Sequence, residues 1–291
     1  MKITNKYGLP SALERFEAKN SYSKGHAEFS ITELIDAPQI SRLQKQHEAE
    51  ITEDISDLIL ALLGTSIHSI LEHGSEIGDI TERRFYTTVS DHVISGQVDR
   101  MELIGELGGA KQYRVEDYKT VKGTKLVIDP EGDQSWHNQL NGYAFLAREN
   151  GYEVEGLSVL AIVRDWAHAS VRRNREFPKH AIVRVPIPLW SYEKQRKYIT
   201  QCVADHTSET VRPCTDLERW RGDKIFAVME YKQDGGLKVK ARKLFKSSVQ
   251  AQTFINNENL KATIVTRDTV STRCFGNYCR VAQFCEQYAN E

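Results

Sequence analysis

Apolar positions change their spacing along this chain, and the change predicts where helices give way to strands. Within residues 55–63 apolar side chains recur at intervals of three and four, which is the period of an amphipathic helix. Farther along, apolar and polar side chains alternate, which predicts strands over residues 81–90, 92–103 and 112–121. The segment GELGGAK separates the second strand from the third and is typical of a hairpin loop.

The helical pattern returns over residues 133–151, where Gly151 marks the expected helix end. Two further strands are predicted over residues 157–166 and 181–189, and another amphipathic helix extends to residue 209. The order helix, hairpin, strand, helix and strand favours an α/β fold over an all-α or all-β fold.

The character of the chain changes near Val211. A proline-bearing loop, the basic run KVKARKLFK and a cysteine-bearing tail indicate a smaller module there. We therefore expect three parts, which are an N-terminal helical segment (1–63), a core (64–210) and a C-terminal module (211–291).

The overall charge excludes little. Lysine and arginine total 39 against 40 acidic residues, so the formal net charge of −1 does not draw the whole chain toward nucleic acid or anionic membrane. The sequence contains no run of about 18 consecutive apolar residues, and its start lacks the pattern of a signal peptide. We expect a cytoplasmic protein with no membrane partner, in which disulfides are not the default state of the five cysteines.

The strand YRVEDYKTV carries an unusual set of charges. Residues two apart on a strand face the same side, so Asp117 and Lys119 project together while Glu116 points the other way. For an isolated pair, a salt bridge at a strand edge is the simpler interpretation. Two other polar residues favour a functional interpretation of this pair. Asp99 lies in another apolar strand, and His68 lies on a helix beside small residues.

His68, Asp99 and Asp117 can assemble one divalent-ion site. Carboxylate oxygens suit Mg²⁺ or Mn²⁺, and an imidazole tilts the choice toward Mn²⁺. Lys119 beside such a site would stabilise the developing charge on a phosphate or help to orient the attacking water. Glu82, in the first predicted strand, is left open between a surface partner for a neighbouring arginine and a place near the metal.

Cys274, Cys279 and Cys285 lie within twelve positions of a chain that is otherwise poor in cysteine. A tetrahedral thiolate site needs a fourth ligand, for which Cys214, in a proline-bearing loop, is preferred to Cys202, in an amphipathic helix. Such a site can hold zinc or an iron–sulfur cluster, and the spacing alone slightly favours zinc.

Taken together, these motifs resemble the PD-(D/E)XK nuclease superfamily, specifically its RecB-type exonuclease branch, which includes phage-encoded and CRISPR-adaptation exonucleases. The resemblance rests on GTSIH, GQVDR, VEDYKT and QLNGY, and it covers roughly residues 64–150. It implies a restriction-endonuclease-like core, a mixed central sheet flanked by helices. The implied metal ligands are His68, Asp99 and Asp117, the implied catalytic residues are Lys119, Asp117 and Asp99, and the implied DNA-binding residues are Gln139 and Tyr143.

The same resemblance implies a [4Fe–4S] cluster on Cys214, Cys274, Cys279 and Cys285, with structural Zn²⁺ as the alternative. The chain departs from many relatives because CFGNYC replaces a CxxC spacing and no cysteine precedes residue 202. The implied function is a Mg²⁺- or Mn²⁺-dependent DNA exonuclease. It would act on single-stranded ends in recombination, repair or phage DNA processing, in a bacterial or phage-infected cell, with protein partners in such a complex. The alternative is a non-catalytic DNA-binding subunit that keeps the nuclease fold as a scaffold.

Overall fold

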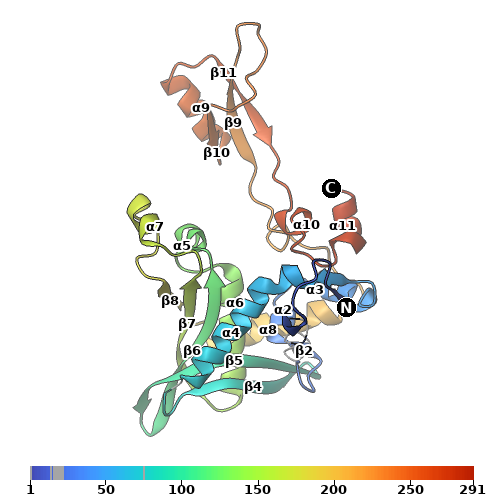
Figure 1. Cartoon of the computed structure of the whole chain (residues 1–291), viewed down its shortest axis with the longest axis vertical. Coiled ribbons are helices and arrows are strands. Elements are labelled where there is room, and N and C mark those ends of the chain that lie inside the picture. Colours follow the sequence, from blue (N-terminus) through green and yellow to red (C-terminus); the bar gives the residue numbers. More distant parts are fainter. Residues whose placement is uncertain (1, 14, 16–22, 75) are drawn as a thin grey trace. The chain divides into compact units, whose positions relative to one another are not determined.

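The computed structural model describes residues 2–13, 15, 23–74 and 76–291 (Figure 1). The chain divides into two compact units, Met1–Arg212 and Pro213–Glu291. The division falls within two residues of the predicted start of the C-terminal module at residue 211. The predicted N-terminal segment is not a separate unit, because it belongs to the first unit together with the core.

The first unit is built on a mixed six-stranded sheet flanked by helices, so the α/β class predicted from the sequence is confirmed. Strand β6 runs parallel to β7 and β2 runs parallel to β5, whereas the other pairs are antiparallel. The strand order is β2-β5-β6-β7-β8, and β4 pairs with β5. These strands are β2 (Phe29–Ser30), β4 (Ile80–Val89), β5 (His92–Leu107), β6 (Ala110–Val121), β7 (Glu153–Val163) and β8 (Ile182–Ile187).

The predicted hairpin loop joins β5 to β6. Leu107 pairs with Ala110, so two residues, Gly108 and Gly109, form the turn with φ of 60° and 86°. Both angles lie in the left-handed region, which glycine adopts without the steric penalty that a Cβ atom imposes. This turn sets the register as far as Gly105, and a shift of one residue between Leu103 and Gly105 then sets the register near Asp99 and Asp117.

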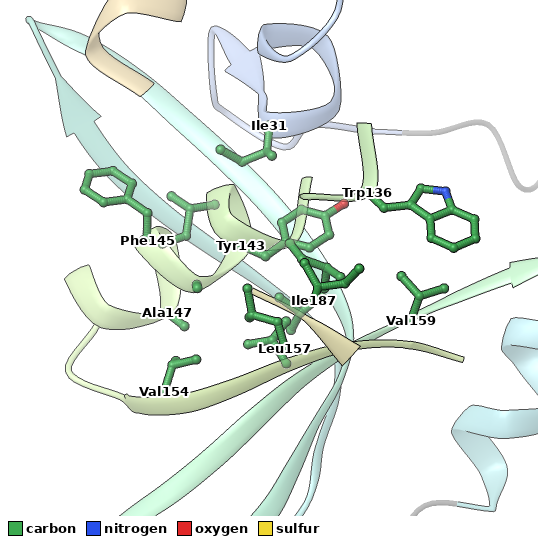
Figure 2. Packing of buried hydrophobic residues seen from close by; sticks show 14 of the residues in the cluster. Ile31, Trp136, Tyr143, Phe145, Ala147, Val154, Leu157, Val159 and Ile187 are labelled. Atoms are coloured by element: carbon green, nitrogen blue, oxygen red, sulfur yellow. The ribbon is translucent and has the colours of Figure 1, made fainter. Parts of the chain in front are cut away.

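Helix α6 (Gln134–Glu149) forms much of the apolar core. The Asp133 side chain accepts a hydrogen bond from the Trp136 N–H and caps the helix start, and Gly151 follows the helix end with φ of 83°. Figure 2 shows Trp136, Tyr143 and Phe145 among the buried side chains of the core. The residues of this core that come from other elements include Ile31, Val154, Leu157, Val159 and Ile187.

The other described helices of the first unit precede or follow α6 in the sequence. Helix α4 carries His68, and α8 carries Cys202, which packs against the apolar core. Their bounds and those of the shorter helices are α2 (Ile31–Leu34), α3 (Pro38–Gln46), the 3-10 helix η1 (Ile55–Leu58), α4 (Ile59–His73), α5 (Gly123–Ile128), α7 (His168–Arg173) and α8 (Tyr192–Thr207).

The N-terminal segment is less helical than the sequence predicts. Strand β1 (Lys2–Thr4) pairs in parallel with β3 (Thr52–Asp54), and β2 joins the main sheet. Strands of two or three residues are too short to show an alternating pattern, so periodicity does not reveal them. The helical part of the prediction is confirmed for α3 and α4.

The second unit contains a three-stranded antiparallel sheet in the order β10-β9-β11. Helix α9 (Ser248–Asn257) packs on this sheet, and Val228, Ala251 and Ile255 form the buried centre of their small core. The sequence predicts a separate module here but not this sheet. The other elements are β9 (Ile225–Glu230), β10 (Lys243–Phe245), β11 (Ala262–Arg267), α10 (Thr272–Phe275), η2 (Ala282–Phe284) and α11 (Glu286–Ala289).

Among the described residues, the continuous helical segment Ile55–His73 is long and apolar enough, by length and composition only, to cross a membrane. A single helix of this kind is weak evidence for a membrane span. In lipid, the polar groups of His68 and Glu72 on this helix would lose their hydration. With one weakly apolar helix of this length among the described residues, the structure is consistent with a protein that is not embedded in a membrane. The cytoplasmic location stays a prediction.

Candidate functional site

Three carboxylates come from neighbouring positions of three adjacent strands. The residues before and after Glu82 pair with the residues after and before Asp99, so Glu82 on β4 lies opposite Asp99 on β5. The β5–β6 ladder ends at the pair Arg100–Glu116, and Asp99 and Asp117 are the next residues along the two strands. The sheet register therefore concentrates negative charge at one place.

His68 reaches this place from helix α4. Its Nδ1 atom lies 3.5 Å from Asp99 Oδ1 and 3.9 Å from Glu82 Oε1, and its Nε2 atom lies 3.2 Å from the Tyr118 carbonyl oxygen. A carbonyl oxygen only accepts hydrogen bonds, so Nε2 carries the proton and donates it. In the neutral ring, Nδ1 is then an acceptor that faces two carboxylate oxygens.

Each of these carboxylates has one oxygen held by a donor. Asp99 Oδ2 accepts a hydrogen bond of 2.7 Å from the Tyr118 backbone N–H, and Glu82 Oε2 accepts one of 2.7 Å from Gln97 Nε2. Glu82 Oε1 is buried and has no hydrogen-bond partner among the described residues. The second oxygen of each carboxylate is therefore available on the side of His68.

The electrostatics show that negative charge is in excess at this site. Burial raises the pKa of Asp99 well above its ordinary value, and the nearby Asp117 carboxylate raises it further. Burial also raises the pKa of Glu82, with added repulsion from Glu72 and Asp117. A cation placed among these acceptors would relieve the repulsion.

The two distances from His68 are compatible with a divalent cation. Two ligands bonded to one Mg²⁺ at about 2.1 Å lie at most about 4.2 Å apart, and the distances from His68 Nδ1 to Asp99 and to Glu82 satisfy this limit. The donor atoms of His68, Glu82 and Asp99 all lie within 4.8 Å of one another, so Glu82 and Asp99 are held to a looser limit. The hydrogen bond from His68 Nε2 to a backbone carbonyl is also the usual way in which a ligating histidine is oriented.

Asp117 has different partners from those of Asp99. Its Oδ2 atom lies 2.6 Å from Lys119 Nζ, and its Oδ1 atom accepts a hydrogen bond of 3.0 Å from Gln139 Nε2. Of the predicted ligands, the structure thus brings His68 and Asp99 into one cluster of donor atoms. Asp117 lies beside this cluster, and Glu82 completes it.

Lys119 carries its charge in this setting. Burial by itself disfavours the charged ammonium, but the carboxylate of Asp117, with further contributions from Asp99 and Asp133, raises the pKa of Lys119 above its ordinary value. The side chain is therefore a fixed positive charge next to the excess of acceptors. This is the arrangement that the sequence predicts for the pair Asp117 and Lys119.

Gln139 and Tyr143 lie one turn apart on α6 and contact each other. Gln139 Nε2 donates to the Tyr143 hydroxyl at 2.9 Å as well as to Asp117. Tyr143 is buried in the core, so in this structure both residues support the carboxylate Asp117. Contact of either residue with DNA stays a prediction.

Glu116 points away from this site, as the alternation of the strand predicts. Its carboxylate is fully buried and lies 3.1 Å from Arg100 Nη1 and 2.9 Å from Arg184 Nε, and it accepts a hydrogen bond of 3.0 Å from Ser158 Oγ. This network compensates the charge of Glu116 locally. Glu116 is therefore part of the framework of the sheet.

The sequence left the role of Glu82 open, although a signal was present. Val89 pairs with His92 at the turn between β4 and β5, and Glu82 and Asp99 each lie seven positions from this pair. Counting outward from the turn places the two acids opposite each other. The count could not be trusted beforehand, because the turn itself, at Ser90 and Asp91, was not identified.

The second unit brings the cysteine loop and the tail together through hydrogen bonds. The Cys214 N–H donates to Gln287 Oε1 at 2.9 Å, and Gln287 Nε2 donates to the Cys214 carbonyl oxygen at 2.8 Å. Arg219 binds Glu291 at 3.2 Å, and the Arg273 N–H donates to the Arg219 carbonyl oxygen. The segment after Cys214 is thereby attached to both ends of the tail.

Cys279 and Cys285 lie within electrostatic range of both Cys214 and Cys274. Burial raises the pKa of Cys214 to about 12, and Glu218, Cys285 and Cys279 add to this increase. Burial raises the pKa of Cys274 as well, again with contributions from Cys279 and Cys285. Thiols are the usual ligands of zinc and iron–sulfur sites, but the described residues whose donor atoms form one cluster are His68, Glu82 and Asp99, so the cysteine site stays a prediction.

Cys202 has a different environment. It lies on α8 in the first unit, where it is partly buried against the apolar core. This placement agrees with the interpretation of Cys202 as a small hydrophobic residue.

Comparisons with known proteins do not assign a family. No family model and no curated protein matches the sequence. A solved structure described as the crystal structure of SSO0001 aligns with a TM-score of 0.47 at 18% identity, over 72% of this chain and 89% of that chain. This likeness is too distant to carry an argument about function.

The separation of Glu116 from the site predicts that it acts on stability. Replacing Glu116 by Gln should lower the free energy of unfolding by about 3 kcal/mol, because two arginines would lose a buried counterion. Chemical denaturation would measure this change, with the exposed Glu106→Gln on the same hairpin as the control. Equal stability of the two variants would contradict the assigned role.

Proposed function

We propose that this chain is a metal-dependent DNA exonuclease of the PD-(D/E)XK superfamily, in its RecB-type branch, with a restriction-endonuclease-like core. The observation that supports this best is the convergence of His68, Glu82 and Asp99 beside the Asp117–Lys119 ion pair. Excess acceptors next to a fixed ammonium suit the hydrolysis of a phosphodiester, in which negative charge develops on phosphate oxygens.

A Mg²⁺ or Mn²⁺ ion held by these residues would activate a water molecule and polarise the scissile phosphate. The chain itself supplies the surroundings. Lys119 stabilises charge on the phosphate, and Asp117 with Gln139 holds Lys119 in place. The Tyr118 backbone orients both Asp99 and His68, through its N–H and its carbonyl oxygen.

DNA as the partner rests on the resemblance and on the distribution of charge. Residues 225–267 of the second unit contain eight lysines and arginines but three acids, a net charge of +5, whereas the whole chain has −1. A local excess of this kind attracts phosphate backbones. Single-stranded ends as the substrate, and recombination, repair or phage DNA processing as the setting, follow from the resemblance.

We propose further that Cys214, Cys274, Cys279 and Cys285 bind a [4Fe–4S] cluster, with Zn²⁺ as the alternative. The three-stranded sheet lies in the sequence between Cys214 and Cys274. A cluster would therefore close the loop that carries this sheet and reduce the entropy of its open state. The hydrogen bonds of Gln287 to Cys214 support this arrangement.

Cleavage should depend on Asp117 and Lys119. Replacing either residue by Ala should reduce the cleavage of end-labelled linear DNA in Mg²⁺ or Mn²⁺ by at least about 100-fold, whereas the exposed Lys111→Ala on the same strand should cleave normally. Circular DNA should stay intact, because an exonuclease needs an end. Circular dichroism and metal content would show that the variants remain folded.

Three results would contradict this function. Cleavage retained in Asp117→Ala or Lys119→Ala would remove the assigned residues from catalysis. Cutting of circular DNA would indicate an endonuclease. DNA binding without any metal-dependent degradation by the unaltered chain would indicate the non-catalytic scaffold.

The cysteine assignment predicts a specific loss of metal. Cys214→Ser and Cys285→Ser should each lower the iron content and the brown colour of protein purified without oxygen, whereas Cys202→Ser should keep both. Elemental analysis measures iron and zinc together, so a colourless protein with one zinc per chain would support the zinc alternative. Full metal content in Cys214→Ser would contradict the proposed ligand set.

The basic segment predicts a salt-dependent contribution to DNA binding. Changing Lys240, Arg242 and Lys246 together to Gln should weaken binding to single-stranded DNA. The slope of log affinity against log salt should fall by about 0.7 for each phosphate contact that is lost. Fluorescence anisotropy would measure both effects, and the charge-preserving set Lys240→Arg, Arg242→Lys and Lys246→Arg serves as the control. An unchanged slope would exclude this segment from the DNA path.

A further inference from the structure

The segment that connects β7 to β8, residues 164–180, concentrates positive charge in the first unit. It contains five lysines and arginines but two acids, a net charge of +3, whereas the whole chain has −1. All five basic residues are exposed to solvent. They are Arg164, Arg172, Arg173, Arg175 and Lys179, and two of them lie on the short helix α7.

The positive charge of this β7–β8 connection is not compensated by neighbouring acids. Among the described residues, none of its five basic side chains forms an ion pair. By contrast Arg184, on the strand that follows, lies 2.9 Å from Glu116. One of the two acids of the connection, Asp165, accepts a hydrogen bond of 2.7 Å from the Gly123 N–H. An exposed excess of one sign of charge attracts partners of the opposite sign.

The β7–β8 connection is anchored to the body of the first unit. Phe177 is buried in the apolar core, and Trp166 and Val171 are partly buried against it. Trp166 Nε1 donates to the Pro178 carbonyl oxygen at 3.0 Å. A Cβ atom added at Gly123 would clash with the Phe177 ring, so the ring lies directly against the start of α5. The basic side chains therefore project from a packed support.

This support lies at the end of the sheet that carries Lys119. Strands β6 and β7 are parallel, with Lys119 opposite Ala161, and the Arg164 N–H donates to the Val121 carbonyl oxygen at 2.9 Å. Helices α5 and α7 follow these two strands at the same end (Figure 1). Arg164 is three positions beyond Ala161, a rise of about 10 Å. One strand of duplex DNA covers this distance in about three nucleotides.

We propose that the β7–β8 connection binds the phosphate backbone of the DNA strand that enters the site, with Arg172, Arg173 and Arg175 as the contacts. The identity of the polyanion as DNA rests on the proposed function. Guanidinium groups bind phosphate oxygens in pairs, and ligands of open α/β sheets bind beyond the carboxyl ends of parallel strands. Backbone contacts carry no sequence information, so this binding is indifferent to the bases.

The test measures DNA binding by the full-length protein, with Arg172, Arg173 and Arg175 changed together to Gln. Fluorescence anisotropy of a labelled single-stranded oligonucleotide, without divalent ions so that no cleavage occurs, gives the Kd at several salt concentrations. The slope of log affinity against log salt should fall by about 0.7 for each lost contact, and by about 2 if all three contacts are lost. Oligonucleotides of different base sequence should show the same fall.

Two control variants separate local contacts from net charge. Changing the same three arginines to Lys keeps the charge and should keep the slope. Changing Lys111 on β6 with Arg196 and Lys197 on α8 to Gln removes an equal charge from other exposed positions and should also keep the slope. An unchanged slope in the arginine-to-glutamine variant, or an equal fall in the second control, would overturn the proposal.

Steady-state cleavage of the same oligonucleotide gives a second readout. The three substitutions to Gln should raise KM and leave kcat unchanged, because contacts of this kind bind the ground state and the transition state equally. A lower kcat at an unchanged KM would contradict a role in backbone binding.

The outcomes distinguish this inference from the proposed function. If the unaltered chain degrades DNA and the arginine-to-glutamine variant keeps its salt slope, the nuclease assignment stands and the assignment of the β7–β8 connection fails. If DNA binding depends on these arginines but no DNA is degraded, the connection binds DNA and the nuclease assignment fails. Binding to vesicles of anionic lipid that depends on the arginines, with unchanged DNA binding, would assign the connection to a membrane surface and overturn the proposal.

Discussion

The pairing of β4, β5 and β6 places the carboxylates of Glu82, Asp99 and Asp117 side by side. The arrangement of the surrounding side chains depends on how the repulsion between these three carboxylates is relieved. Folding imposes this arrangement, because the same backbone ladder and apolar core that build the sheet also fix its register. Burial limits the hydration of these carboxylates, and for the same reason it raises the pKa of Asp99 well above its ordinary value. The surroundings must therefore supply donors or cations.

The donors that surround the site compensate part of this charge. A backbone N–H binds Asp99, Gln97 binds Glu82, and Lys119 with Gln139 binds Asp117. Each donor binds one carboxylate oxygen and thereby also fixes the orientation of that carboxylate. Two of the carboxylates keep an oxygen toward His68, so a cation bound there would relieve the remaining repulsion. On the other side of β6, two arginines balance Glu116 and leave no comparable excess.

The second unit shows the same principle with thiols. Gln287 holds the Cys214 backbone, and Arg219 connects to the tail through Glu291 and the Arg273 N–H. These hydrogen bonds attach the loop that carries Cys214 to the C-terminal tail. Burial raises the pKa values of Cys214 and Cys274, which disfavours the ionisation of these two thiols. A metal held by the cysteines stays a proposal.

Local patterns in the sequence predicted most of the longer elements of the first unit but not the six-residue strands β9 and β11 of the second. The alternation over β4, β5 and β6, the glycine turn at Gly108 and Gly109, and the capped helix α6 all follow from backbone preferences within a few residues. The three-residue strands β1, β3 and β10 have no such pattern, and their existence depends on partners that are distant in the sequence.

The same distinction holds for the site. The sequence by itself determined that Asp117 and Lys119 point together and Glu116 points away, because the pleat of a strand is local. Only the tertiary structure showed that Glu82 lies in one cluster of donor atoms with His68 and Asp99, beside Asp117. This placement depends on the β4–β5 register and on the Arg84–Gln97 contact, which follow from the sequence only once the turn at Ser90 and Asp91 is identified.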